Sequence, residues 1–214
     1  MNVSHNEDFR ANQKERTRSA LVAAATAMLR RGAPPTVAEA AEEAKVSRAT
    51  AYRYFPTQEA LLLEITSLTP LVAPVETALA NLTTDDVEER LLVVLDTINP
   101  IALSDEVAMR TALRLYQDMW LENHGNDDTP PVREGRRMRW LDRVLEPVRA
   151  DLSDQQWNRL RYALALTMNI DALAIMKDVC RIDDDDEALE VLRWAARALL
   201  RAGLDDRDSL VEPS

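Results

Sequence analysis

Helix signals recur along the whole chain, while strand signals are almost absent. No apolar–polar alternation with a period of two is long enough to indicate a sheet. Two capping boxes, Thr36-Val-Ala-Glu39 and Ser153-Asp-Gln-Gln156, each predict a helix start, because the two side chains satisfy each other's free backbone N–H groups. Further N-cap candidates are Ser47, Thr57, Ser104 and Asp184. The chain is therefore predicted to be all-α.

Glycine and proline mark the expected helix ends, at Gly32, Pro56, Asn99-Pro100, Gly125 and Gly203. Starts and stops together predict nine helices joined by short links. Their expected bounds are 13–31, 36–44, 47–54, 57–82, 85–99, 104–123, 131–151, 153–181 and 184–202.

Composition excludes several classes of protein. A hydrophobic share of 46% among 214 residues is enough for a real core. The single cysteine, Cys180, cannot form an intrachain disulfide and favours a reducing, cytoplasmic location. Two distant histidines, His5 and His124, leave little for a zinc site, so we expect no metal and no cofactor. Apolar runs such as 91–95 are far shorter than the roughly 20 residues of a membrane span, and no apolar stretch follows Met1, so we expect neither membrane partner nor secretory signal.

The net charge of −11 is divided unevenly along the chain. Residues 1–60 hold 9 Lys/Arg and 7 Asp/Glu, a net charge of +2, whereas residues 61–214 hold 17 and 30, a net charge of −13. The first part can approach a polyanion and the remainder would be repelled by one. An acidic chain of this kind is therefore compatible with DNA binding by its N-terminal part.

Residues 36–55 predict two short helices separated by a turn at Lys45 and Val46. Short helices are marginal alone and need a longer helix to pack on. Together with the first helix they predict a three-helix helix-turn-helix unit. Its expected core positions are Leu21, Ala24, Ala25, Met28 and Leu29 in the first helix, and Val37, Ala40, Ala41, Ala44, Val46, Ala51 and Phe55 in the two short ones.

The second short helix carries the chemistry that points to DNA. No acid occurs between Ala44 and Gln58, and three of the ten aromatic residues fall in 52–55. Arg48 can bond a guanine edge bidentately and Thr50 can meet a base edge, while Tyr52, Arg53 and Tyr54 can reach phosphates. The alternative is an ordinary solvated face of a helical hairpin that never touches DNA.

Residues 13–65 resemble the tetracycline-repressor (TetR/AcrR) family of transcriptional regulators. The matching segments are Arg31-Gly32, Thr36-Val37, Val46-Ser47, Thr50-Ala51-Tyr52-Arg53-Tyr54-Phe55 and Glu59-Ala60-Leu61. The resemblance implies a DNA-binding domain at 1–56, with its motif at 36–55, and a regulatory and dimerisation domain at 57–210. The DNA contacts expected from the residues and the resemblance together are Thr36, Lys45, Ser47, Arg48, Ala49, Thr50, Tyr52, Arg53, Tyr54 and Thr57.

The chain departs from the family pattern at several of these positions. Lys45 replaces the usual turn glycine, so we expect a side chain at positive φ, at a cost of about 1 kcal/mol. Gln58 replaces a common phosphate-binding lysine, and Tyr54 stands where histidine is common. Ala40 and Ala51 replace bulkier residues, which predicts a loosely packed small core.

The last two helices are apolar over a wide arc, which suggests contact with a partner as well as with their own domain. The expected homodimer contacts are Leu164, Met168, Ile175, Leu192, Ala196 and Leu199, the alternative being a purely intramolecular core. A small-molecule effector site is the other expectation. Its candidate residues are Met109, Leu113, Tyr116, Met119, Trp120, Trp140, Met168, Asn169 and Asp171, although the same residue types also form ordinary cores. Asp171 has three interpretations, which are an ion pair with an arginine, the dimer seam and ligand binding.

These observations favour a homodimeric repressor of an operator in double-stranded DNA, released when an effector shifts the helix at 57–82, which Pro70 and Pro74 would bend. The alternative is a helical protein-interaction module of the same fold that has lost DNA or ligand binding. We expect no enzyme and name no catalytic residue, because neither histidine lies in a Glu-x-x-His pair. The sequence also lacks a P-loop, a Gly-x-Ser-x-Gly elbow and a dinucleotide fingerprint.

Overall fold

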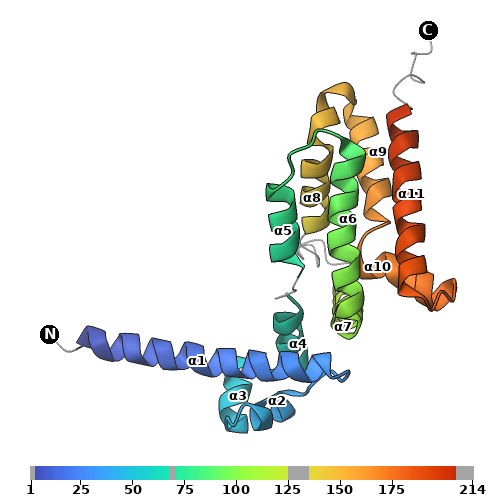
Figure 1. The fold of residues 1–214 in the computed structure, drawn as a ribbon. Coiled ribbons are helices and arrows are strands. Elements are labelled where there is room, and N and C mark those ends of the chain that lie inside the picture. Colours follow the sequence, from blue (N-terminus) through green and yellow to red (C-terminus); the bar gives the residue numbers. More distant parts are fainter. Residues whose placement is uncertain (1–2, 68–70, 125–134, 206–214) are drawn as a thin grey trace. The chain divides into compact units, whose positions relative to one another are not determined.

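The computed structural model describes residues 3–67, 71–124 and 135–205, in which every regular element is a helix (Figure 1). The chain divides into two compact units, Met1–Thr69 with Asp105–Thr129, and Pro70–Ser104 with Pro130–Ser214. The helices of the first unit are α1 (Val3–Arg30), α2 (Val37–Glu43), α3 (Arg48–Tyr54), α4 (Gln58–Ser67) and α7 (Glu106–Asn123). Those of the second unit are α5 (Val72–Ala80), α6 (Val87–Ser104), α8 (Arg136–Leu145), α9 (Asp154–Ala165), α10 (Asn169–Ala174) and α11 (Asp185–Asp205).

The all-α class is confirmed, but the described residues hold eleven α-helices rather than the nine expected. The helix expected at 57–82 is present as α4 and α5. Of the two prolines expected to bend it, Pro70 lies outside the described residues and Pro74 lies in the first turn of α5. The helix expected at 131–151 is α8 followed by a 3₁₀ segment, Glu146–Asp151. The helix expected at 153–181 is divided into α9, α10 and a π-helical turn, Ile175–Val179.

Local capping chemistry explains several of the helix starts. Both capping boxes form, at Thr36 and at Ser153. The side-chain oxygens of Ser47, Thr57 and Asp184 also accept bonds from backbone N–H groups of the turn that follows them. The prediction for Ser104 is wrong: this residue ends α6, and its hydroxyl donates to the Ile101 carbonyl at 2.9 Å.

Two expected helix stops are also wrong. Pro100 lies inside α6, which continues to Ser104. Gly203 lies inside α11, where a Cβ would come within 2.7 Å of the Leu160 side chain. The glycine therefore permits a close approach of α11 to α9, rather than ending the helix.

The first unit has a small, tightly packed core. It is formed by α1 to α4 together with Leu115 of α7. Ala40 and Ala51 are completely buried there, so both of these small residues belong to the core. Arg18 of α1 forms an ion pair with Glu64 at 2.6 Å and lies 5.8 Å from the centre of the Phe55 ring, which joins α1 to α4 and to the end of α3.

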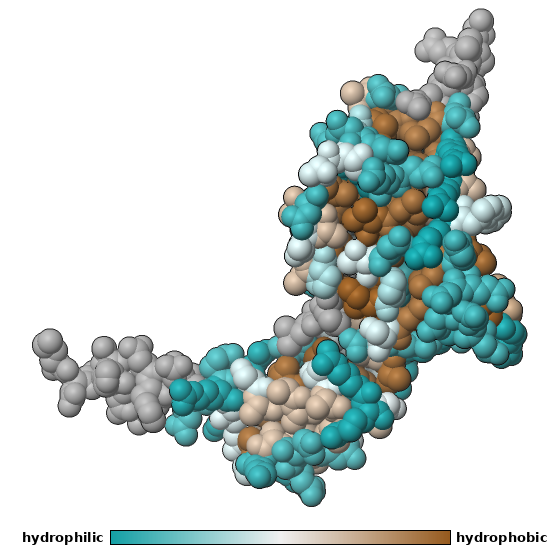
Figure 2. All heavy atoms as spheres, in the orientation of Figure 1, coloured by the Kyte–Doolittle hydropathy of each residue, from teal (hydrophilic) through white to brown (hydrophobic). Residues whose placement is uncertain are grey.

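In the second unit, α6 packs against α5, α8, α10 and α11, and α9 packs against α8 and α11 (Figure 1). Figure 2 shows apolar side chains in patches between hydrophilic ones over the face of this unit that is in view. The Arg90 guanidinium donates to the carbonyls of Thr84, Arg143 and Val144, at 2.7 to 3.0 Å. A cation is favourable there because two of those carbonyls belong to the last turn of α8.

The break between α9 and α10 depends on a side chain from α6. Met168 is extended (φ −116°, ψ 138°) and Asn169 has a left-handed backbone (φ 69°). The buried Asn99 amide accepts from the Asn169 N–H at 2.7 Å and donates to the Thr167 carbonyl at 3.1 Å. Asn99 therefore satisfies two of the backbone groups that the break leaves without a helical partner.

Replacing Asn99 with alanine is expected to lower the free energy of unfolding by about 2–3 kcal/mol, because two buried backbone groups lose their partner. Urea denaturation followed by circular dichroism measures the change. Asn81→Ala, at the exposed end of α5, is the matched control and should be near neutral. Equal effects of the two substitutions would contradict a structural role for the Asn99 amide.

Candidate nucleic-acid interface

The turn between α2 and α3 is closed by backbone hydrogen bonds. The Val46 N–H donates to the Ala41 carbonyl at 2.8 Å, and the Lys45 N–H donates to the Glu42 carbonyl at 3.1 Å. This pair of bonds is a Schellman motif, which places the residue after the C-cap in a left-handed backbone. Lys45 has φ 55°, so the predicted positive φ is confirmed.

Lys45→Gly is expected to stabilise the first unit by about 0.5–1 kcal/mol, since glycine adopts this backbone without strain and part of the gain is lost to its greater freedom when unfolded. Thermal unfolding measures the shift. Lys45→Ala removes the same charge but keeps a Cβ at positive φ, and should give no stabilisation. A matching gain in the alanine variant would assign the effect to charge instead of backbone strain.

Helix α3 presents one polar face and one buried face. Ser47 is its N-cap, and its oxygen accepts from the Thr50 N–H at 3.2 Å. Ala51 and Phe55 are buried, as expected for core residues. The exposed residues of this segment are Ser47, Arg48, Ala49, Tyr52 and Arg53, whereas Thr50 and Tyr54 are part-buried. The face therefore offers guanidinium, hydroxyl and phenol groups without a carboxylate.

Comparison with known families gives one match. The sequence model of the bacterial regulatory proteins of the tetR family matches residues 20–65, which cover the C-terminal part of α1, all of α2 and α3, and most of α4. Residues 20–65 are therefore similar to the DNA-binding part of tetR-family regulatory proteins. No curated protein and no solved structure matches the chain. This similarity, together with the polar face of α3, supports a DNA-binding transcriptional regulator.

Thr36 and Thr57, two expected phosphate contacts of the tetR-family domain, are both exposed at helix starts. The Thr36 hydroxyl and N–H both donate to Glu39 at 2.8 Å, and these bonds hold the pKa of the Glu39 carboxyl below its usual value. The pKa of Glu59 is also lowered, first by its own backbone N–H and then by the Thr57 hydroxyl. Ionised carboxylates therefore occupy both helix starts, and a phosphate that approaches the Thr36 hydroxyl has to displace Glu39 from it.

Outside the tetR-family match, the expected effector residues fall in two groups. One group of five residues lies on α7 in the first unit. In this group Met109 is buried, and Trp120 is 54% exposed. The Trp120 ring lies 4.5 Å from the His124 ring. The other four lie in the second unit. There Trp140 is buried and donates to Glu76 at 2.8 Å, and Met168 is completely buried. The members of the α7 group are Met109, Leu113, Tyr116, Met119 and Trp120, and those of the second unit are Trp140, Met168, Asn169 and Asp171.

The hydrogen bonding of Asp171 and Asn169 bears most directly on ligand binding. Asp171 accepts from Arg137 at 2.6 Å, so the first of its three interpretations, the ion pair with an arginine, is confirmed. The Asn169 Oδ1 atom is buried and has no hydrogen-bond partner among the described residues. A buried acceptor without a donor is unfavourable, which makes Asn169 the candidate with the clearest capacity to receive a ligand.

The expected dimer residues lie mostly inside their own chain. Leu164, Met168, Leu192 and Ala196 are at most 4% exposed, whereas Ile175 is 51% exposed and Leu199 is part-buried. The first four contact their own unit, because their side chains complete its core. The sequence prediction missed large apolar residues on the outer sides of the same elements. These are Tyr162 and Leu166 near the end of α9, Val179 in the π-helical turn, and Val191 and Trp194 of α11.

The described residues contain no group of three or more His, Cys, Asp or Glu that could hold a metal ion. Among the same residues, no helix is long and apolar enough to cross a membrane.

Proposed function

We propose that this chain is a homodimeric repressor that binds an operator with two half-sites and is released by a small-molecule effector. The observation that carries the proposal is α3, a capped helix with an exposed face of arginine, tyrosine and hydroxyl groups inside a tetR-family domain. A helix of this kind fits the DNA major groove, where Arg48 can bond a guanine and Tyr52 can meet the flanking phosphates.

The homodimer is supported by an unusually apolar surface. We name as the apolar face the exposed residues of α9, the π-helical turn and α11, all of which are 36–74% exposed: Tyr162, Leu166, Ile175, Val179, Val191 and Trp194. Helices α9 and α11 pack against each other, so residues of the two helices can join in one surface. Large contiguous apolar patches are rare on monomeric proteins, and a second copy of the chain would cover these side chains.

Dimerisation also suits the DNA-binding mode. Helix-turn-helix dimers bind two half-sites one or more helical turns apart, and linking two modules raises the affinity without any new contact. The second unit carries the apolar face, and the first carries α3. The division of the chain into a DNA-binding region at 1–56 and a regulatory and dimerisation region at 57–210 is therefore part of the proposal.

The effector response is supported by two features of the chain. The buried Asn169 Oδ1 atom would accept a hydrogen bond from a hydroxyl or amine group of a ligand. In addition, α6 of the second unit leads directly through Asp105 into α7, whose Leu115 shares a core with α1 and α4. A shift of α6 on ligand binding would therefore reach the DNA-binding helices, and a coupling of about 1–3 kcal/mol would weaken DNA binding several- to a hundredfold.

Fluorescence anisotropy with duplex DNA from the promoter upstream of the gene, at two salt concentrations, tests the proposal. Binding that weakens steeply with added salt supports the regulator, because each phosphate contact releases counterions. A dimeric, folded protein that retains no duplex would instead support the interaction module of the same fold.

A further inference from the structure

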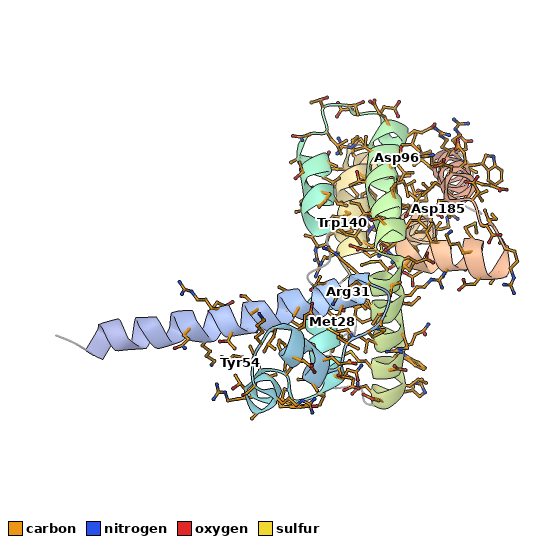
Figure 3. The ribbon with its side chains drawn as sticks, turned by 60° about the horizontal axis from the view of Figure 1, so that its bottom comes forward. Met28, Arg31, Tyr54, Asp96, Trp140 and Asp185 are labelled. Atoms are coloured by element: carbon orange, nitrogen blue, oxygen red, sulfur yellow. The ribbon has the colours of Figure 1, made fainter. Side chains whose placement is uncertain are left out.

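A second polar surface of the first unit lies beside α3. A groove with a volume of about 660 Å³ is lined by Gln13, Lys14 and Thr17 of α1 and by Thr50, Arg53 and Tyr54 of α3. The two helices pack against each other, and Figure 3 shows Tyr54 on α3 close to α1. The α1 residues lie before residue 20, where the tetR-family match begins.

The groove has the chemistry of an anion site. Its lining combines two cations, Lys14 and Arg53, with three hydroxyl groups and one amide, and it contains no carboxylate. The Arg53 guanidinium lies 5.7 Å from the centre of the Tyr54 ring, a cation–π distance that restrains its side chain along this side of α3. The Thr17 hydroxyl already donates to the Gln13 carbonyl at 2.9 Å. The charged and neutral donors left for a phosphate oxygen are those of Lys14, Arg53, Thr50, Tyr54 and the Gln13 amide.

The position of the groove beside α3 favours a phosphate of the DNA backbone over a free anion. An α-helix with its side chains is about 10–12 Å wide and the major groove is about 12 Å wide, so side chains on the flank of an inserted helix meet the sugar–phosphate backbone. Thr50 and Arg53 belong both to the groove and to α3. A free anion bound there would compete with DNA for the same side chains, whereas a backbone phosphate would bind together with the bases that α3 meets.

We propose that the groove between α1 and α3 seats a phosphodiester of the operator backbone, with Lys14 as a DNA contact outside the 36–57 segment. The proposal rests on the proposed function, since it requires α3 to enter the major groove. It assigns Lys14 to positioning the duplex and not to reading its sequence, because a phosphate is the same at every base pair.

The test compares Lys14→Ala with Arg16→Ala in the full-length chain. Both variants lose one exposed cation from α1, but Arg16 does not line the groove and is displaced by about 200° around the helix. Anisotropy is measured over a series of salt concentrations with promoter DNA and with a scrambled duplex. For Lys14→Ala we expect the slope of log K against log salt to lose about one unit per protomer, with equal weakening on both duplexes. Arg16→Ala should keep the wild-type slope, and Lys14→Arg should restore it.

Several results would overturn the proposal, and they separate it from the proposed function. Equal slopes for the two alanine variants, with wild-type binding intact, would remove the groove from the interface and leave the regulator standing. If Lys14→Ala lost the difference in affinity between promoter DNA and the scrambled duplex, Lys14 would be a base contact and not a phosphate contact. Inorganic phosphate that raises the melting temperature of the wild type but not of Lys14→Ala, at constant ionic strength, would make the groove a free-phosphate site. Wild-type protein that binds neither duplex would overturn both proposals.

Discussion

Replacing Arg48 and Tyr52 together with alanine is expected to weaken operator binding about a hundredfold or more. Both side chains extend from the exposed face of α3, and Tyr52 is 46% exposed. A bidentate contact between arginine and guanine accounts for about 1–3 kcal/mol of discrimination, and the tyrosine adds a phosphate contact that the alanine cannot make. The residual binding should show less preference for the operator over a scrambled duplex.

The fold should survive this double substitution, because neither residue belongs to the core of the first unit. Circular dichroism and size-exclusion chromatography check the helix content and the oligomeric state. Arg31→Ala, which removes an exposed guanidinium near the end of α1 that pairs with Glu43 at 3.3 Å, is the matched control for loss of charge. Unchanged, salt-sensitive binding in the double variant would show that α3 is not the helix that reads DNA.

The helix-turn-helix unit could be predicted from the sequence because its signals are local. The Thr36 capping box, the Ser47 N-cap and the positive φ of Lys45 each depend on residues within five positions of one another. Such bonds form whenever the segment folds, whatever the rest of the chain does.

The second unit was predicted less well because its irregularities depend on distant residues. The break between α9 and α10 is stabilised by Asn99, which lies 70 positions before Asn169. Gly203 lies inside α11, where the Leu160 side chain of α9 fills the space that a Cβ at position 203 would need. No short-range pattern reports such contacts, so the sequence shows a continuous apolar helix where the structure has a break, and a stop where the helix continues.

The apolar pattern also does not tell which partner a residue meets. Leu164 and Leu166 are two positions apart, yet Leu164 is completely buried and Leu166 is 74% exposed. Hydrophobicity predicts that both avoid water, but only the packing of α9 shows which one its own chain already covers. The prediction of a dimer from these helices therefore named mostly core residues, and Ile175 is the one member of the apolar face among them. The groove beside α3 was missed for a related reason, because Lys14 and Arg53 are brought together only by the packing of α1 against α3.

If the chain forms the proposed homodimer, substituting glutamate for Leu166 and Trp194 of the apolar face is expected to convert it to monomers. Burying a large apolar side chain contributes about 1.5–3 kcal/mol, and a glutamate in the same place would bury an unpaired charge. A two-fold interface presents each residue twice, so the dimer dissociation constant should rise by at least about a hundredfold. Sedimentation velocity at micromolar concentration measures the change.

The chain offers a matched control for this substitution in Leu121 of α7. Leu121 is 67% exposed, close to the 74% of Leu166, but it belongs to the first unit and lies outside the apolar face. Leu121→Glu should therefore leave the dimer intact. Monomers made by the double substitution keep α3 unchanged but lose the linkage between half-sites, which is worth about 10²–10⁴ in affinity, so their operator binding should fall by a factor in that range. A double variant that remains dimeric would contradict the assignment of the apolar face to the homodimer. A monomer that binds the operator as tightly as the wild type would contradict it too, because loss of the linkage should weaken binding.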